Sequence, residues 1–252
     1  MIKSKSNLAI LLSKLRIFEA PKLKVEQYTT DSEIAAAVLW QAYYLRDIEN
    51  KTIADLGSGT GILGLGALVL GAKKVFFVES DKSSIQTLEL NLKFLEEKIG
   101  TKLVKKAIFL NKDIKDFNKK VDTIVQNPPF GTKQKHADKI FLKKAFSLAN
   151  VIYSFHKLET EGFVNKISED YGFGITNLWK FDFPIKATYS FHKKRIQRIK
   201  VGCWRMKKIK LNNSEISCRF CRIYVIFKLY KGHTTHMGIP ICQPILTLAS
   251  YF

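Results

Sequence analysis

Short apolar runs rich in β-branched and aromatic residues alternate along this chain with longer stretches whose apolar residues recur at helical spacing. The pattern predicts strands at 51–56, 74–79, 107–110, 121–126, 151–155, 174–183 and 197–206, and helices at 7–19, 32–45, 61–70, 82–97, 138–149 and 160–170. Strands that alternate with helices indicate an α/β fold, with a seven-stranded, mostly parallel sheet flanked by helices. In such a sheet, ligands bind at the carboxyl ends of the strands.

Four candidate ligand-binding features fall at the carboxyl ends of separate predicted strands. A glycine-rich loop, 57–61, follows the first strand, and Glu79 ends the second. Asp113 comes near the end of the third strand, and Asn127 directly after the fourth. Because these strand ends meet at one edge of a parallel sheet, the four features are predicted to line a single site.

The glycine loop has the spacing Asp55-x-Gly57-x-Gly59-x-Gly61. It is neither the Gly-x-Gly-x-x-Gly of a dinucleotide site nor a phosphate loop, because no Gly-Lys-Ser/Thr follows. Glu79 stands about 20 positions after the loop, where an acid can accept hydrogen bonds from ribose hydroxyls. Asp55 followed by this turn resembles the S-adenosylmethionine (SAM) site of the Rossmann-like methyltransferases. The alternative is a tight turn followed by a surface acid.

The fourth strand leads into Asn127-Pro128-Pro129-Phe130, followed by Gly131-Thr132-Lys133. Proline fixes φ and has no N–H, so the carbonyl groups before and between the prolines are held ready to accept hydrogen bonds. An amide beside a planar aromatic ring suits a flat base that carries an amino group. The loop is therefore predicted to bind the group that receives a methyl.

The chain is strongly basic, with a net charge of +20 and a pI near 9.7 over 252 residues. Between Lys186 and Lys210 there are ten basic residues and no acidic one, interleaved with aromatics. Such a segment favours nucleic acid as the partner. A lysine-rich, solvated surface is the alternative.

No apolar run reaches the roughly 18 residues of a membrane-spanning helix, so no membrane association is expected. All four cysteines, Cys203, Cys218, Cys221 and Cys242, lie in the last fifth of the chain, which favours an intracellular, cytoplasmic protein without a disulfide framework. Cys218-x-x-Cys221 and His233-x-x-His236 have poor spacing for zinc, so no metal site is expected.

The motifs together resemble the RNA N6-adenine methyltransferases of archaea and eukaryotes that modify ribosomal RNA. The resemblance runs from about residue 7 to 208. Its segments are Gln27-Tyr28-x-Thr30, Ile48-Glu49-Asn50-Lys51, Asp55-Leu56-Gly57-x-Gly59-x-Gly61, Asp122-Thr123, the 127–133 loop, Tyr153-Ser154-x-His156-Lys157 and Phe191-His192-Lys193-Lys194. Ser58 and Thr60 depart from the family, since close eukaryotic relatives tend to have Cys at these positions.

The resemblance implies a Rossmann-like class I SAM-dependent fold over 1–208 and an extension of unknown role over 209–252. It implies that Asp113 accepts from the adenine amino group of SAM and that Asn127, Pro128, Pro129 and Phe130 hold the target adenine. The SAM site would comprise Gln27, Thr30, Asp55, Gly57, Gly59, Thr60, Gly61, Ile62, Glu79, Asp113 and Ile114.

The resemblance also implies partners. Ribosomal RNA is the expected substrate, and Lys133, Lys157, Lys193 and Lys194 are expected to contact it. His156 and His192 are either phosphate contacts or satisfied residues. A small zinc-binding activator protein is expected to pair with the third strand as an exposed edge. In a eukaryote, the protein would also be expected in the nucleus or nucleolus.

Three other functions stay open on the sequence. Protein-glutamine N5-methyltransferases use a similar Asn-Pro-Pro loop, usually with Tyr in the fourth place. DNA adenine methyltransferases share the chemistry. A basic RNA-binding module with a vestigial SAM fold is the alternative that is not an enzyme.

Overall fold

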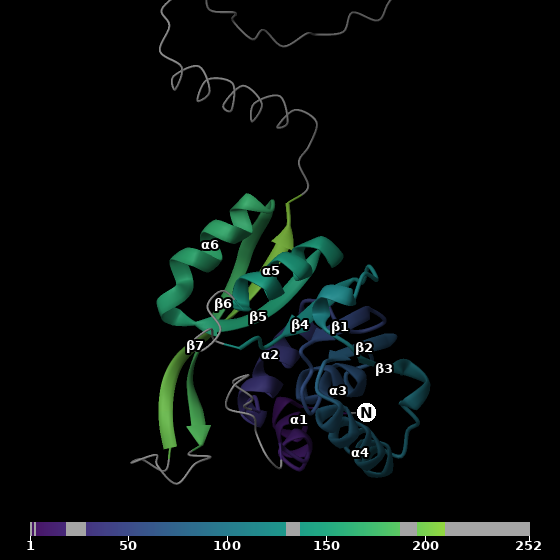
Figure 1. Cartoon of the computed structure of the whole chain (residues 1–252). Coiled ribbons are helices and arrows are strands. Elements are labelled where there is room, and N and C mark those ends of the chain that lie inside the picture. The colour runs from purple at the N-terminus through teal and green to yellow at the C-terminus, as the bar shows by residue number, and fades with distance from the viewer. Residues whose placement is uncertain (1, 3, 19–28, 130–136, 187–195, 210–252) are drawn as a thin grey trace, which may run out of the picture. The chain divides into compact units, whose positions relative to one another are not determined.

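The structure is a computed structural model, and it describes residues 2, 4–18, 29–129, 137–186 and 196–209. Seven strands form one sheet in the order β3-β2-β1-β4-β5-β7-β6 (Figure 1). The strands are β1 (Thr52–Leu56), β2 (Lys74–Glu79), β3 (Ala107–Asn111), β4 (Thr123–Gln126), β5 (Val151–Lys157), β6 (Phe173–Lys186) and β7 (Ile196–Lys208). The predicted fold class is confirmed.

The first five strands pair in parallel, and β7 runs antiparallel to both β5 and β6. The helices are α1 (Lys5–Leu12), α2 (Ser32–Tyr44), α3 (Ile62–Val69), α4 (Lys82–Ile99), α5 (Ala137–Leu148) and α6 (Glu161–Asp170). Among the described residues, no helix has the length and apolar character needed to cross a membrane.

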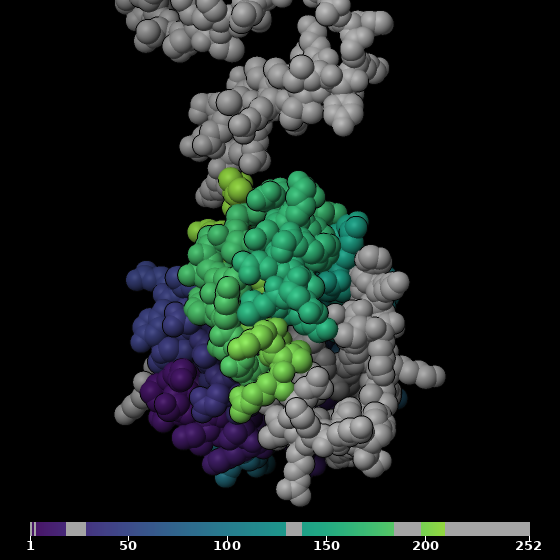
Figure 2. All heavy atoms as spheres, turned by 90° about the vertical axis from the view of Figure 1, so that its left-hand side faces the viewer, coloured from purple at the N-terminus to yellow at the C-terminus, as the bar shows by residue number. Residues whose placement is uncertain are grey.

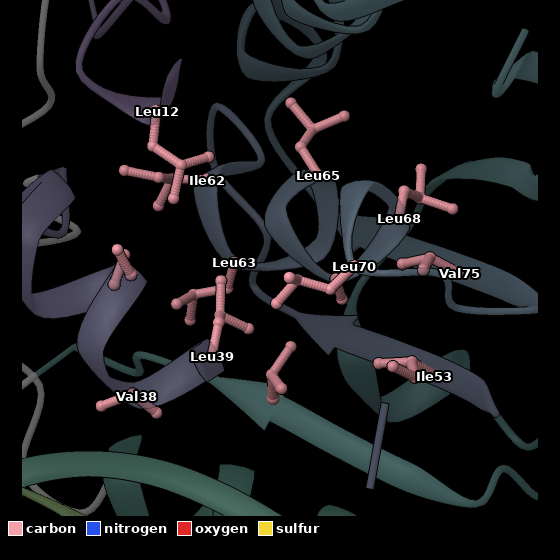
Figure 3. Close-up of a cluster of buried hydrophobic side chains, with 14 of the residues drawn as sticks. Leu12, Val38, Leu39, Ile53, Ile62, Leu63, Leu65, Leu68, Leu70 and Val75 are labelled. Carbon is pink, nitrogen blue, oxygen red and sulfur yellow. The ribbon is translucent and has the colours of Figure 1, made fainter. Parts of the chain in front are cut away.

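Two hydrophobic clusters cover the two faces of the sheet. One joins α1, α2, α3 and α4 to strand residues such as Ile53 and Val75, and the other joins α5 and α6 to residues such as Ile124 and Ile152. Figure 3 shows part of the first cluster, where Leu12 of α1 lies beside Ile62 of α3 and Leu39 of α2 lies beside Leu63 of α3. Strand residues alternate between the two clusters because successive side chains point to opposite faces.

The N-terminal segment departs from the prediction. A helix was expected over 7–19, but α1 begins at Lys5, capped by the Ser4 side chain, and ends at Leu12. Leu15 is still buried in the core, so its apolar character reflects packing of the segment after the helix rather than another helical turn. This segment continues to Phe18, beside the glycine loop.

A buried ion pair joins the region after α2 to the other half of the sheet. The Arg205 Nε donates to Asp47 Oδ2 at 2.8 Å, and the Tyr153 hydroxyl donates to the same oxygen at 2.6 Å. The Thr123 hydroxyl also donates to the Asp47 carbonyl at 2.7 Å.

Figure 2 views the side where β7 and β6, in green, lie next to the purple N-terminal helices.

Candidate active site

The carboxyl ends of β1, β2, β3 and β4 surround a cavity of about 500 Å³. This arrangement follows from the sheet order, since the four strands are parallel neighbours. From the predicted SAM and adenine sites, the cavity is lined by Thr30, Asp55, Gly57, Gly59, Thr60, Ile62, Glu79, Asp113, Ile114, Asn127 and Pro129. The structure therefore brings together most of the residues singled out in the sequence.

Other predicted site residues do not line the cavity or cannot be placed. Gly61 and Pro128 are described but are not part of the lining. The residues outside the described part of the chain are Gln27, Phe130, Lys133, His192, Lys193 and Lys194, together with Cys218, Cys221, His233 and His236 of the tail. Roles predicted for them stay predictions.

The glycine loop turns sharply because its glycines adopt left-handed backbone conformations. Gly61 has φ +92°, and a Cβ built on it would lie 2.0 Å from Leu88 Cδ1 of α4. The N–H groups of Gly57 and Ser58 both donate to the Val78 carbonyl of β2, at 2.8 and 3.1 Å. The loop is thus held against the second strand, and only glycine fits where it meets α4.

Asp55 has a structural partner within the site. Its side chain is 2 % exposed, and its Oδ2 accepts from the Gly64 N–H at 2.8 Å, in the first turn of α3. Burial raises the pKa of this carboxyl to about 7; the Gly64 hydrogen bond works against that rise, and the charge of Glu79 adds to it. Asp55 therefore holds the start of α3 and also faces the cavity.

Glu79 fixes the glycine loop to the end of β2. Its Oε2 accepts from the Gly59 N–H at 2.9 Å, and its Oε1 accepts from the Asp81 N–H at 2.8 Å. A carboxylate has about four lone-pair positions, so both oxygens can also accept from a ligand hydroxyl. Glu79 lines the cavity, and its ribose-binding role stays a prediction.

Asp113 begins the short helix η3 (Ile114–Asp116), where its Oδ1 accepts from the Lys115 N–H at 2.8 Å. Lys144 of α5 supports this loop from outside. Its Nζ donates to the carbonyls of Lys115 and Phe117, at 2.7 and 3.0 Å. Lysine spacing along α5 gives no sign of this contact, because it depends on how α5 packs on η3.

Asn127 has one satisfied and one unsatisfied side-chain group. Its Nδ2 donates to Thr30 Oγ1 at 2.9 Å, while its Oδ1 is buried without a hydrogen-bond partner among the described residues. Thr30 directly precedes Asp31, whose side chain caps α2. The start of α2 therefore orients the Asn127 amide at the end of β4.

His156 is not available for contact with RNA. The side chain is 2 % exposed, and its Nε2 lies 2.7 Å from Ser154 Oγ, which also accepts from the Gln126 amide at 3.0 Å. Burial lowers the pKa of His156 to about 3, so the ring is neutral at physiological pH. It is therefore a satisfied interior residue, and the phosphate-contact alternative is wrong for it. Lys157 forms an ion pair with Glu159 at 3.2 Å.

Two cavity-lining aromatics, Phe18 and Phe141, were missed by the sequence reasoning. A Cβ on Gly57 would lie 2.9 Å from Phe141 Cε1, and a Cβ on Gly59 would lie 2.8 Å from Phe18 Cζ. Both aromatic rings therefore pack directly against the glycine loop. Nothing in the helical pattern around either residue marks it as part of a site. Among the described residues, no group of three or more His, Cys, Asp or Glu could hold a metal.

The chain matches known proteins over the region of this site. Residues 30–168 match the family model described as Conserved hypothetical protein 95. An uncharacterised protein of Methanocaldococcus jannaschii is 37% identical over 83% of this chain and 96% of its own length. The rRNA N(6)-adenosine-methyltransferase Mettl5 of Drosophila melanogaster is 34% identical over 75% of this chain and 90% of its own length.

The chain is also similar to solved structures of methyltransferases. The crystal structure of a candidate RNA methyltransferase from Pyrococcus horikoshii has a TM-score of 0.75 and 42% identity, and covers 83% of this chain and 100% of that one. A magnesium protoporphyrin IX methyltransferase from Synechocystis with bound SAM has a TM-score of 0.55 and 14% identity over 70% of this chain and 79% of its own. The second similarity shows the fold alone, which is that of the class I SAM-dependent methyltransferases.

Proposed function

This chain belongs to the family of rRNA N6-adenosine methyltransferases, and we propose that it methylates the N6 amine of one adenosine in ribosomal RNA, with SAM as the methyl donor. The observation that carries the proposal is Asn127 at the cavity, with its Oδ1 unpaired among the described residues. Leaving a buried acceptor unpaired costs about 1–3 kcal/mol. An amino group of a substrate would relieve that cost.

The residues of the cavity fit SAM. Its volume of about 500 Å³ lies within the range of cofactor sites, and the glycine loop lets backbone approach closely. Glu79 would accept from the ribose hydroxyls and Asp113 from the adenine amino group. Glu79, together with Asp55 above its pKa of about 7, gives an acidic surrounding that suits a cationic sulfonium. When bound, SAM supplies an electrophilic methyl group.

The Asn-Pro-Pro loop would prepare the nucleophile. The exocyclic nitrogen of adenine shares its lone pair with the ring and is weakly nucleophilic. If Asn127 Oδ1 and the Pro128 carbonyl accept its two N–H protons, a more tetrahedral nitrogen is favoured, with its lone pair aimed at the methyl group. Phe130 would stack on the base. Orientation of this kind can contribute roughly 7–11 kcal/mol, so no strong general base is needed before transfer.

The basic charge of the chain supports a polyanionic substrate. Net charge +20 attracts RNA and makes its binding dependent on salt. We propose that Lys133, Lys157, Lys193 and Lys194 contact phosphates, and that the target adenosine is unstacked to enter the site. Work on ribosomal RNA would place the protein in the cytoplasm, or also in the nucleolus if the source is eukaryotic.

An activator subunit is the second part of the proposal. β3 is an edge strand of the sheet, and its residues Ile108, Phe109 and Leu110 are only half-buried. An edge strand presents unpaired backbone groups that another chain can extend. We propose that a small zinc-binding protein pairs with it, and that mixing the two proteins raises methyl transfer.

A radiolabelled methyl-transfer assay tests the proposed function. Ribosomal RNA, DNA and a Gly-Gly-Gln peptide are offered separately, with and without the activator. Transfer to the N6 amine of adenosine in ribosomal RNA is expected. Transfer mainly to DNA or to the peptide would support the corresponding other enzyme, and RNA binding without any transfer would leave only the RNA-binding module.

A further inference from the structure

The segment after α1 forms part of the cavity wall through Phe18. Phe18 is half-buried and lines the cavity, and its ring edge meets the glycine loop at Gly59. The contact is so close that a Cβ on Gly59 would lie 2.8 Å from Phe18 Cζ. The N–H of Gly59 donates to Glu79, so Phe18 and the carboxylate at the end of β2 both contact the same glycine of the loop.

One buried amide holds this segment beside the loop. Asn91 lies within α4 and is 1 % exposed. Its Oδ1 accepts from the Arg16 N–H at 2.8 Å, and its Nδ2 donates to the Arg16 carbonyl at 3.0 Å. The same Nδ2 donates to the Thr60 carbonyl of the glycine loop at 2.9 Å. A single side chain thus ties two separate parts of the chain, both of which reach the cavity.

The packing of the preceding residues makes this arrangement rigid. Leu12 and Leu15 are buried in the core, so the segment is anchored before it reaches Arg16. Two backbone hydrogen bonds to Asn91 then fix the direction in which the chain leaves, two residues before Phe18. A buried polar group that loses such partners costs about 1–3 kcal/mol, so this geometry is strongly specified.

We propose that Phe18 is a cofactor-binding residue, an apolar wall against the ribose side of SAM, and that Asn91 is the positioning residue that holds it there. The inference rests on the proposed function, because it takes the cavity to be the SAM site. Phe18 contributes by covering apolar ligand surface and excluding water, which requires no change in the glycine loop or in Glu79. Asn91 acts through the backbone at Arg16 and does not touch the cofactor.

Calorimetric titration of the full-length protein with SAM and with S-adenosylhomocysteine (SAH) tests the proposal. Phe18→Ala is expected to raise the Kd of both ligands at least tenfold, because they share the ribose. Phe163→Ala is the matched control, since this Phe lies on α6, is 36% exposed and does not line the cavity. An unchanged Kd in Phe18→Ala would overturn the assignment.

A double-mutant cycle tests the positioning role. Asn91→Ala should raise the Kd for SAM, and much of that effect should disappear when Phe18 is already Ala, since residues that act through one another are not additive. Fully additive effects would show that Asn91 does not act through Phe18. A purely structural role would lower the melting temperature and leave the Kd unchanged.

A measurement on the unmodified protein covers the case in which Asn91→Ala fails to fold. Amide hydrogen exchange of the 13–18 segment should slow when SAM is added. Unchanged exchange would contradict the proposal that Phe18 packs against SAM. If the unmodified protein binds neither SAM nor SAH, the proposed function itself fails. If it binds both, while Phe18→Ala binds them equally well, only the role assigned to Phe18 fails.

Discussion

Replacement of Asp55 by Asn is predicted to remove a pH-dependent loss of stability. The carboxyl is 2 % exposed, and burial is the main reason why its pKa rises from 3.8 to about 7. The Gly64 N–H that it accepts at 2.8 Å limits the rise without cancelling it. An asparagine oxygen can accept the same hydrogen bond, so Asp55→Asn removes the charge and keeps the contact with α3.

The direction follows from proton binding in the two states. Between pH 3.8 and about 7 the folded protein keeps the Asp55 proton that the unfolded chain has released. The free energy of unfolding therefore falls as pH rises through this window and levels off above it. At about 1.4 kcal/mol per pH unit, the full rise in pKa corresponds to at most roughly 4 kcal/mol.

Urea denaturation of the cofactor-free protein from pH 4.5 to 8.5 provides the measurement. The stability of Asp55→Asn relative to the unmodified protein should increase with pH up to about 7 and then stay constant. Other titrating groups are common to both proteins and cancel in the difference. Asp116→Asn removes a charge from an exposed side chain and serves as the control. Parallel pH curves for Asp55→Asn and the unmodified protein would refute the reasoning.

Three further predictions concern activity, the buried ion pair and the domain boundary. Asn127→Ala should lower methyl transfer roughly 10²–10³-fold, as expected for one lost stabilising group, while the Kd for SAM changes little; retention of most activity would contradict the assigned role. Arg205→Met leaves the Asp47 carboxylate buried without its cation and should cost about 3–5 kcal/mol in urea denaturation, with partial recovery in the double variant with Asp47→Asn. Removal of residues 210–252 should leave methyl transfer to ribosomal RNA intact, because residues 1–209 form a compact unit of their own, which ends where the Ile209 N–H donates to the Gly172 carbonyl; loss of activity in a folded, truncated protein would show that the tail takes part.

Much of the site could be predicted because it lies where the chain changes from strand to loop. Asp55, Glu79, Asp113 and Asn127 each stand at or near the carboxyl end of a strand, and all four line the cavity. A parallel sheet brings such ends together whatever the side chains are. The spacing of the glycines likewise predicted a tight turn, and the left-handed φ of Gly61 shows why glycine is required.

The departure of the N-terminal segment from the prediction has a physical cause. The apolar residues around 7–19 have helical spacing, but Leu15 and Phe18 pack against the core and the glycine loop after α1 has ended. Periodicity reports which residues are buried, and it does not report what buries them. The two alternatives for His156 could not be separated from the sequence, because a histidine beside a lysine occurs both on surfaces and in interiors. β5 is buried on both faces from Ile152 to His156, so His156 is an interior residue, while Lys157 at the strand end pairs with Glu159.

The sequence by itself determined the succession of strands and helices along the chain, the tight turn at the glycine loop, and which polar residues stand at the strand ends. These features depend on local backbone preference and on periodicity. Only the tertiary structure decided what surrounds those groups. Asn91 reaches Arg16 across 75 positions, and Asn127 reaches Thr30 across 97. Contacts of this kind depend on how helices pack on the sheet, and no local pattern encodes that packing. Which residues wall the cavity, and how far burial raises the pKa of Asp55, are therefore decided only in the folded protein.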